Sequence, residues 1–280
     1  MAGRTGAGAA GGAGLAGGKK DGASAEAAGL AGATGDAGAP DRTATAGAPG
    51  GPAARPLELW PLSRGAAIFD FDGTLAETWD LWHEVDEVFF ASRGLPFDED
   101  SSLTLATLGF EPGARWCVEH YRLREDPAHI VDEWNRLGSA LYRSRVRLRP
   151  GAEAYLRRLR AASVPLALAT TNDPQVLDSM EHVRVRELFD AVVCGREVAR
   201  GKDAPDIYLE AAARLGATPE GCVVFEDILP GIRSAAGAGM ATCAVLCDDP
   251  RQRPQRAALA DAADLLIADW LDPRLGGYSS

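Results

Sequence analysis

The 280-residue chain contains no long apolar run. A secretory signal needs a continuous apolar core behind a basic start, and a transmembrane helix needs roughly 20 consecutive apolar residues. Because neither pattern occurs, we expect a cytoplasmic protein with no membrane partner.

Positive charge and cysteine are also scarce. Lys and Arg number 29 against 40 Asp and Glu, which gives a net charge of −11 at pH 7. We therefore expect no nucleic-acid partner, because such binding depends on basic side chains that neutralise phosphates. The 5 cysteines show neither metal-ligand nor redox spacing, and this pattern predicts buried, reduced thiols.

Aromatic residues are absent from residues 1–56, a segment that contains 16 of the 32 glycines. Such a segment cannot bury enough apolar surface to offset its ordering entropy, so we expect a disordered tail. A short C-terminal tail is expected at 273–280. The rest of the chain has room for one substantial domain and a smaller one.

A short apolar strand ends in a distinctive polar sequence. Ile68 and Phe69 are followed by Asp70-Phe71-Asp72-Gly73-Thr74-Leu75. In a pleated strand the two aspartates point to the same side, and ligands of open α/β sheets collect at the carboxyl ends of the strands. Two close acids need a neutralising cation, and Mg²⁺ prefers such oxygens. Gly73 permits a sharp turn and a close approach to a ligand.

A second apolar strand, residues 164–169, ends in Thr170-Thr171-Asn172-Asp173. Hydroxyl groups at a strand end either cap the next helix or donate hydrogen bonds to a phosphate oxygen. The sequence alone leaves both uses open.

Two further charged groups follow later strands. Lys202 begins the sequence Lys202-Asp203-Ala204-Pro205-Asp206, and the apolar run 222–225 ends in Glu226-Asp227. Carboxylates thus recur at the end of a strand. Strands that alternate with helices predict a mostly parallel sheet covered on both faces.

Residues 77–146 have a different pattern. Trp79, Trp82, Val85 and Phe89 recur at helical spacing, and more periodic stretches follow up to Tyr142. We expect an all-helical insertion whose aromatic residues mostly form its core.

These segments together resemble the four motifs of the haloacid dehalogenase superfamily. The sequence from Asp70 to Leu75 is identical to motif I, Asp-x-Asp-Gly-Thr-Leu. The second strand is similar to motif II, with Thr170 as the match and Thr171 as the alternative one residue on. Lys202 begins a match to motif III, Lys-x-x-Pro-Asp, and Glu226 begins a match to motif IV, Glu-Asp-x-x-x-Gly-Ile.

The resemblance implies a Rossmann-like three-layer α/β core with a small helical cap, as in the phosphatase and β-phosphoglucomutase-like branch. The core would comprise 57–76 and 147–272, and the cap 77–146. The cap would close over the site, exclude water and select the substrate.

The resemblance also implies residue roles. Asp70 would be the nucleophile that forms an aspartyl-phosphate, and Asp72 the general acid and base. Thr170 and Lys202 would complete the catalytic set. The remaining implied residues contact the phosphoryl group (Gly73, Thr74, Thr171, Asn172) or hold Mg²⁺ (Asp70, Asp72, Glu226, Asp227).

The predicted function is magnesium-dependent hydrolysis of a small phosphorylated metabolite, such as a sugar phosphate. Asp72 favours phosphoryl transfer, because the dehalogenating branch lacks this second acid. A sugar phosphomutase and a catalytically silent binding module are the alternatives. The mutase is less favoured because the cap segment has no basic substrate-gripping motif. Monomer and dimer both remain open.

Overall fold

The computed structural model describes residues 56–276. Residues 1–55 and 277–280 of the two predicted tails lie outside the described residues. Residues 273–276 of the predicted C-terminal tail are described, and Pro273–Leu275 form a 3-10 turn in which Leu275 is buried. The described residues belong to one compact unit.

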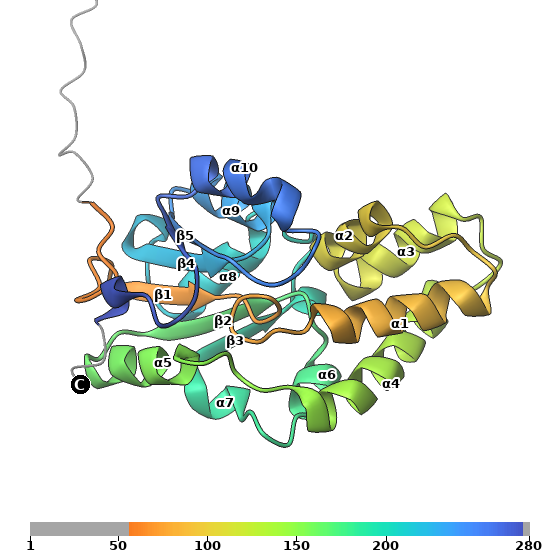
Figure 1. The fold of residues 1–280 in the computed structure, drawn as a ribbon, viewed down its shortest axis with the longest axis horizontal. Helices are drawn as coiled ribbons and strands as arrows, with labels where there is room; N and C mark the ends of the chain where they lie inside the picture. Colours follow the sequence, from red (N-terminus) through yellow and green to blue (C-terminus); the bar gives the residue numbers. More distant parts are fainter. Residues whose placement is uncertain (1–55, 277–280) are drawn as a thin grey trace, which may run out of the picture. The chain divides into compact units, whose positions relative to one another are not determined.

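The centre of the unit is a six-stranded parallel sheet in the order β3-β2-β1-β4-β5-β6 (Figure 1). The strands are β1 (Ala66–Phe69), β2 (Leu166–Thr170), β3 (Ala191–Cys194), β4 (Cys222–Glu226), β5 (Ala241–Val245) and β6 (Leu265–Ile267). The predicted α/β fold with a mostly parallel sheet is thus confirmed, and β3 and β6 are its edge strands. The first motif follows the strand that lies between β2 and β4.

The helices of the core cover both faces of the sheet (Figure 1). They are α5 (Ala152–Ala161), α6 (Pro174–Asp178), α7 (Val185–Leu188), α8 (Asp206–Arg214), α9 (Leu229–Gly237) and α10 (Arg256–Ala262). Periodicity predicts a single helix over residues 175–189, and this prediction is wrong. The chain between α6 and α7 leaves the helix and instead buries Met180 and Val183 in the core.

Strand β1 is apolar throughout because both of its faces are buried. On one face, the ring of Phe69 stacks on Phe225 with centroids 4.6 Å apart and packs against Tyr155 of α5. On the other face, Ile68 belongs to a cluster with Tyr208 of α8. Alternate side chains therefore fix the strand between the two helical layers, and the residues that follow it are held rigidly.

Between β1 and α5 the chain forms four helices: α1 (Trp79–Ser92), α2 (Glu99–Leu108), α3 (Phe110–His120) and α4 (Pro127–Arg145). Asp98 and Asp126 cap the N-termini of α2 and α4 by accepting backbone N–H groups. These helices share a core of their own, in which Phe89 packs against Phe90 and Trp134. We refer to α1–α4 as the helical insertion.

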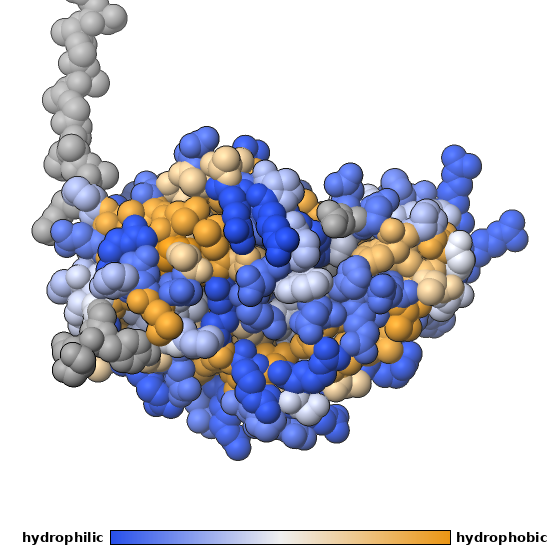
Figure 2. Space-filling model, in the orientation of Figure 1, coloured by the Kyte–Doolittle hydropathy of each residue, from blue (hydrophilic) through white to orange (hydrophobic). Residues whose placement is uncertain are grey.

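The surface of the helical insertion mixes hydrophilic and apolar residues on the face drawn in Figure 2. This pattern is typical of amphipathic helices that bury one side. No helix among the described residues is long and apolar enough to cross a membrane. All five cysteines are buried and unpaired, as the sequence predicts.

Candidate active site

The predicted motif residues meet at the carboxyl ends of the three central strands. Asp70 follows β1, Thr170 ends β2 and Glu226 ends β4. Lys202 reaches the same place from the loop before α8. In parallel sheets this edge is where ligands bind, because several loops converge there.

Asp70, Lys202 and Glu226 form a buried charged triad. The Lys202 ammonium lies 2.5 Å from Asp70 Oδ1 and 2.8 Å from Glu226 Oε2, and all three side chains are at most 3% exposed. Tyr208 donates a further hydrogen bond to Glu226 Oε2 over 3.0 Å. One cation thus bridges two acids, which places a positive charge directly beside the predicted nucleophile.

Asp227 adds a third carboxylate to this cluster. Ligand oxygens of Asp70, Glu226 and Asp227 all lie within 4.8 Å of one another. Burial, and then the nearby Glu226 charge, raise the pKa of Asp70 to about 7, although Lys202 opposes the shift. The same two causes raise the pKa of Asp227 well above its ordinary value. A single lysine therefore leaves the cluster short of positive charge.

This oxygen-only donor set fits a hard divalent cation. Mg²⁺ is bound in proteins through one or two carboxylates and keeps several waters. Among the described residues, those placed to hold such a cation are Asp70, Asp227 and Glu226.

Position 73 must be glycine because the side chain of Asp227 lies directly against its backbone. A Cβ atom on Gly73 would stand 2.2 Å from Asp227 Oδ2, and the glycine has a φ of +76°. The predicted close approach is therefore an approach to a carboxylate of the cluster. The neighbouring Thr74 hydroxyl donates to Asp227 Oδ1 over 3.2 Å.

Two residues that the motifs do not predict hold the turn after β1. Arg149 donates to the carbonyl oxygen of Gly73 over 2.7 Å and to that of Leu246 over 2.7 Å. Trp270 Nε1 donates to the carbonyl oxygen of Thr74 over 2.8 Å. These contacts satisfy buried carbonyl groups and fix the turn to β5 and to the C-terminal segment.

Asp72 is held by four side-chain donors. Its Oδ1 accepts hydrogen bonds from the Thr78 hydroxyl at 2.5 Å, from Trp82 Nε1 at 3.3 Å and from the Tyr142 hydroxyl. Its Oδ2 accepts from Asn172 Nδ2 at 2.6 Å. Burial, and then the nearby Asp70 charge, raise the pKa of Asp72 to about 6.

Of the polar residues at the end of β2, one contacts the loop backbone and the others line the cavity. The Thr170 hydroxyl accepts a hydrogen bond from the backbone N–H of Asn172 over 3.2 Å and is fully buried. Thr171 and Asn172 line the cavity, and Thr170 is not among its lining residues. The two threonines therefore face different surroundings.

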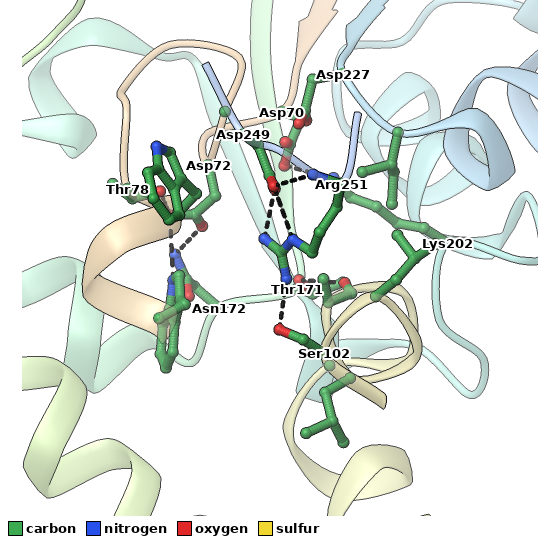
Figure 3. A pocket seen from close by; sticks show the side chains of 18 of the residues that line it. Asp70, Asp72, Thr78, Ser102, Thr171, Asn172, Lys202, Asp227, Asp249 and Arg251 are labelled. Atoms are coloured by element: carbon green, nitrogen blue, oxygen red, sulfur yellow. Dashed lines mark hydrogen bonds and ion pairs between the residues drawn. The ribbon is translucent and has the colours of Figure 1, made fainter. Parts of the chain in front are cut away.

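The cavity lies between the strand ends and the helical insertion (Figure 3). Its volume is about 100 Å³. Its floor contains Asp70, Asp72, Lys202 and Asp227, and its far side is mainly apolar. Apart from Ile228, the apolar lining comes from the helical insertion: Trp79, Trp82, Val85, Leu103, Leu105, Ala106, Phe110 and Trp134.

An arginine spans the cavity from the core to the helical insertion. Arg251 forms a double hydrogen bond from Nε to the carboxylate of Asp249, and its Nη1 donates to Ser102 of α2 over 2.6 Å (Figure 3). Ser102 in turn donates to Asp86 of α1 over 2.7 Å. Burial raises the pKa of Asp86 to about 6. No sequence motif points to this chain of contacts.

Comparison with known proteins agrees with this geometry. A family model described as haloacid dehalogenase-like hydrolase matches residues 65–239. The chain belongs to this family. The predicted family resemblance is thus confirmed.

Three relatives of similar identity each cover more than half of the chain. A probable pseudouridine-5'-phosphatase of Drosophila melanogaster is 34% identical over 75% of this chain and 92% of its own length. The CbbY structure from Rhodobacter sphaeroides with phosphate is 30% identical, covers 77% of this chain and 98% of its own, and superposes with a TM-score of 0.65. A phosphorylated carbohydrates phosphatase of Thermotoga maritima is 29% identical over 62% of this chain and 82% of its own length. The predicted class, a phosphoric monoester hydrolase, is confirmed by the family and by these phosphatases.

This haloacid dehalogenase-like hydrolase also contains site residues that sequence reasoning missed. Trp82 was expected only to pack in the helical core, yet its indole N–H reaches Asp72. Tyr142, Arg149 and Arg251 carry no motif signal. Each has a long side chain with a polar end. Many surface residues share this feature, so the sequence does not single these three out.

Proposed function

We propose that this hydrolase cleaves a small phosphate monoester through an aspartyl-phosphate on Asp70, with Mg²⁺ as its cofactor. The observation that carries the proposal is the buried Asp70 carboxylate, held 2.5 Å from Lys202 within a cluster of three acids. A phosphate monoester repels nucleophiles by its own charge, so positioning and charge neutralisation supply most of the catalysis.

The residues would act in two steps. A carboxylate oxygen of Asp70 attacks phosphorus as the bond to the leaving oxygen breaks, and Asp72 gives its proton to that oxygen. Asp72 then takes a proton from water as the water attacks the aspartyl-phosphate, which releases phosphate and restores Asp70.

Charge on the phosphoryl oxygens would be neutralised from two sides. Lys202 supplies one positive charge beside Asp70. Asp70, Asp227 and the main chain of Asp72 would hold Mg²⁺, and Glu226 would support the ion through its water ligands. The bound ion would supply Lewis-acid charge stabilisation. The turn at Gly73 and Thr74 would present its backbone to the phosphoryl group.

The groups after β2 complete the phosphoryl site. Thr171 and Asn172 line the cavity and are proposed to bind the phosphoryl oxygens. The catalytic role predicted for Thr170 is tested by Thr170→Val against Thr171→Val. If Thr170 binds the phosphoryl group, its variant raises KM and lowers kcat more than the Thr171 variant does.

The helical insertion is proposed to act as the cap that selects the leaving group. Its largely apolar wall suits a sugar-like or similarly sized neutral group. Relatives named for pseudouridine 5'-phosphate and for phosphorylated carbohydrates support this substrate class. The five buried, unpaired thiols support a reducing compartment such as the cytoplasm.

The test is phosphate release from a panel of small monoesters, with and without Mg²⁺. We expect turnover that requires the metal, is abolished in Asp70→Asn and is kept in Asp178→Asn, an exposed aspartate that pairs with Arg186. Phosphate release that survives in Asp70→Asn would refute the nucleophile. Isomerised sugar phosphate without phosphate release would favour the mutase, and neither product would favour the silent module.

A further inference from the structure

The hydrogen bonds of Asp72 are distributed unequally between its two oxygens. Three donors converge on Oδ1, and two of them, Trp82 and Tyr142, belong to the helical insertion. The third, Thr78, directly precedes α1. Oδ2 accepts only the Asn172 amide among the contacts of the described residues.

The two aromatic donors also form a chain. Trp82 Nε1 lies 2.6 Å from the Tyr142 hydroxyl, and this hydroxyl donates to Asp72 Oδ1. Each hydrogen bond in such a chain polarises the next, and a bond to a charged acceptor is stronger than one between neutral groups. The single indole N–H of Trp82 is shared between the Tyr142 hydroxyl at 2.6 Å and Asp72 Oδ1 at 3.3 Å, so Trp82 acts on Asp72 chiefly through Tyr142.

An oxygen that accepts three donors has no lone pair left for a proton, because a carboxylate offers about four acceptor positions over two oxygens. The proton that Asp72 transfers must then reside on Oδ2. This oxygen keeps an acceptor position beside the Asn172 amide.

We propose that Trp82 and Tyr142 are positioning residues that fix Oδ2 of Asp72 as the oxygen that gives the proton to the leaving group. The inference rests on the proposed role of Asp72 as the general acid. Oδ1 is turned toward its donors on α1 and α4, whereas Oδ2 lies beside Asn172, and both Asp72 and Asn172 line the cavity. Figure 3 shows Asp72 between Thr78 and Asn172 at one side of that cavity.

The two positioning residues lie 60 positions apart, on α1 and α4. Both helices must pack against the turn after β1 for Oδ1 to receive its donors. The helical insertion therefore contributes to the orientation of the acid as well as to the wall of the cavity.

A leaving-group series separates this role from simple packing. General-acid help matters for a poor leaving group, such as an alkoxide, and matters little for 2,4-dinitrophenolate, which departs without a proton. The experiment measures the first turnover with Mg²⁺ for an alkyl phosphate and for 2,4-dinitrophenyl phosphate. The variants are Tyr142→Phe and Trp82→Phe, which keep the rings and remove the donors.

We expect Tyr142→Phe to slow transfer from the alkyl ester by about 10- to 100-fold, part of the 10²- to 10⁴-fold that a general acid supplies. Transfer from the dinitrophenyl ester should change by less than about 3-fold, because no proton is needed there. Trp82→Phe should show the same selectivity with a smaller effect. Tyr155→Phe is the matched control, since Tyr155 is also buried but donates to the Leu59 carbonyl oxygen and not to Asp72.

Asp72→Asn distinguishes failure of this inference from failure of the proposed function. If Asp72→Asn slows both esters equally, Asp72 is not the acid and the proposed mechanism is wrong. If Asp72→Asn is selective for the alkyl ester while Tyr142→Phe and Trp82→Phe are not, Asp72 is the acid and the positioning role is refuted. A slowing of both esters in the two aromatic variants would likewise show a purely structural role.

Discussion

Replacing Lys202 with methionine should destabilise this hydrolase strongly in the absence of metal. Lys202 is 2% exposed and bridges Asp70 and Glu226 at 2.5 and 2.8 Å. Methionine retains most of the volume of the side chain but none of its charge. The two acids would then remain buried without a cationic partner.

The expected size follows from other buried ion pairs. Removal of one partner of such a pair costs about 3–5 kcal/mol, because the remaining charge is left unpaired. With a urea dependence of about 3 kcal/mol per M, the unfolding midpoint should fall by about 1 to 1.7 M. The loss should shrink as pH falls below about 7, because Asp70, whose pKa is raised to about 7, then takes up a proton.

The assay is urea unfolding at pH 8 in EDTA, followed by circular dichroism. Lys202→Met combined with Glu226→Gln should lose less than the sum of the two single changes, since one of the unpaired acids is then neutral. The control is Arg157→Met, which breaks an exposed pair with Glu153 and should cost less than about 0.5 kcal/mol. A loss below about 1 kcal/mol for Lys202→Met would refute the view that Lys202 neutralises the acids.

Three other outcomes are expected. Mg²⁺ at 100 times its dissociation constant should stabilise the wild type by about 2.7 kcal/mol; calorimetry should find no such gain in Asp227→Asn, and an equal gain would contradict the ligand assignment. Gly73→Ala should abolish Mg²⁺-dependent stabilisation, because its Cβ would stand 2.2 Å from Asp227 Oδ2. An unchanged affinity for Mg²⁺ in titration calorimetry would contradict this expectation. The pKa of Asp86 is raised from 3.8 to about 6, so the contribution of Asp86 to wild-type stability should fall by about 3 kcal/mol as pH rises from about 4 to 6. Asp86→Asn should therefore be the more stable protein at pH 7.5 and equal to wild type at pH 3.5, and a less stable variant at pH 7.5 would contradict the burial argument.

The floor of the site could be predicted from the sequence because its residues carry local signals. Asp70 and Glu226 stand directly at the ends of apolar strands, and parallel strands end at a common edge. The structure accordingly brings Asp70, Lys202 and Asp227 together, while their catalytic roles stay predictions.

The upper part of the site could not be predicted, for a physical reason. Trp82 and Tyr142 follow the same helical periodicity as the core residues around them, and their contact with Asp72 depends on how α1 and α4 pack. Periodicity gives the buried face of a helix but not which buried polar atom meets which partner. The same limit applies to the segment between α6 and α7, where tertiary burial overrides helix propensity.

The position of β1 at the centre of the sheet has a consequence for synthesis of the chain. Its partners β2 and β4 pair with it from Leu166 and from Cys222 onward, so the second neighbour leaves the ribosome about 150 residues later, some 8 to 30 s at ordinary elongation rates. The helices α1–α4, with their own core, have time to fold in that interval. The nascent chain thus carries its predicted nucleophile on a strand that lacks one of its two neighbours until β4 and Asp227 emerge.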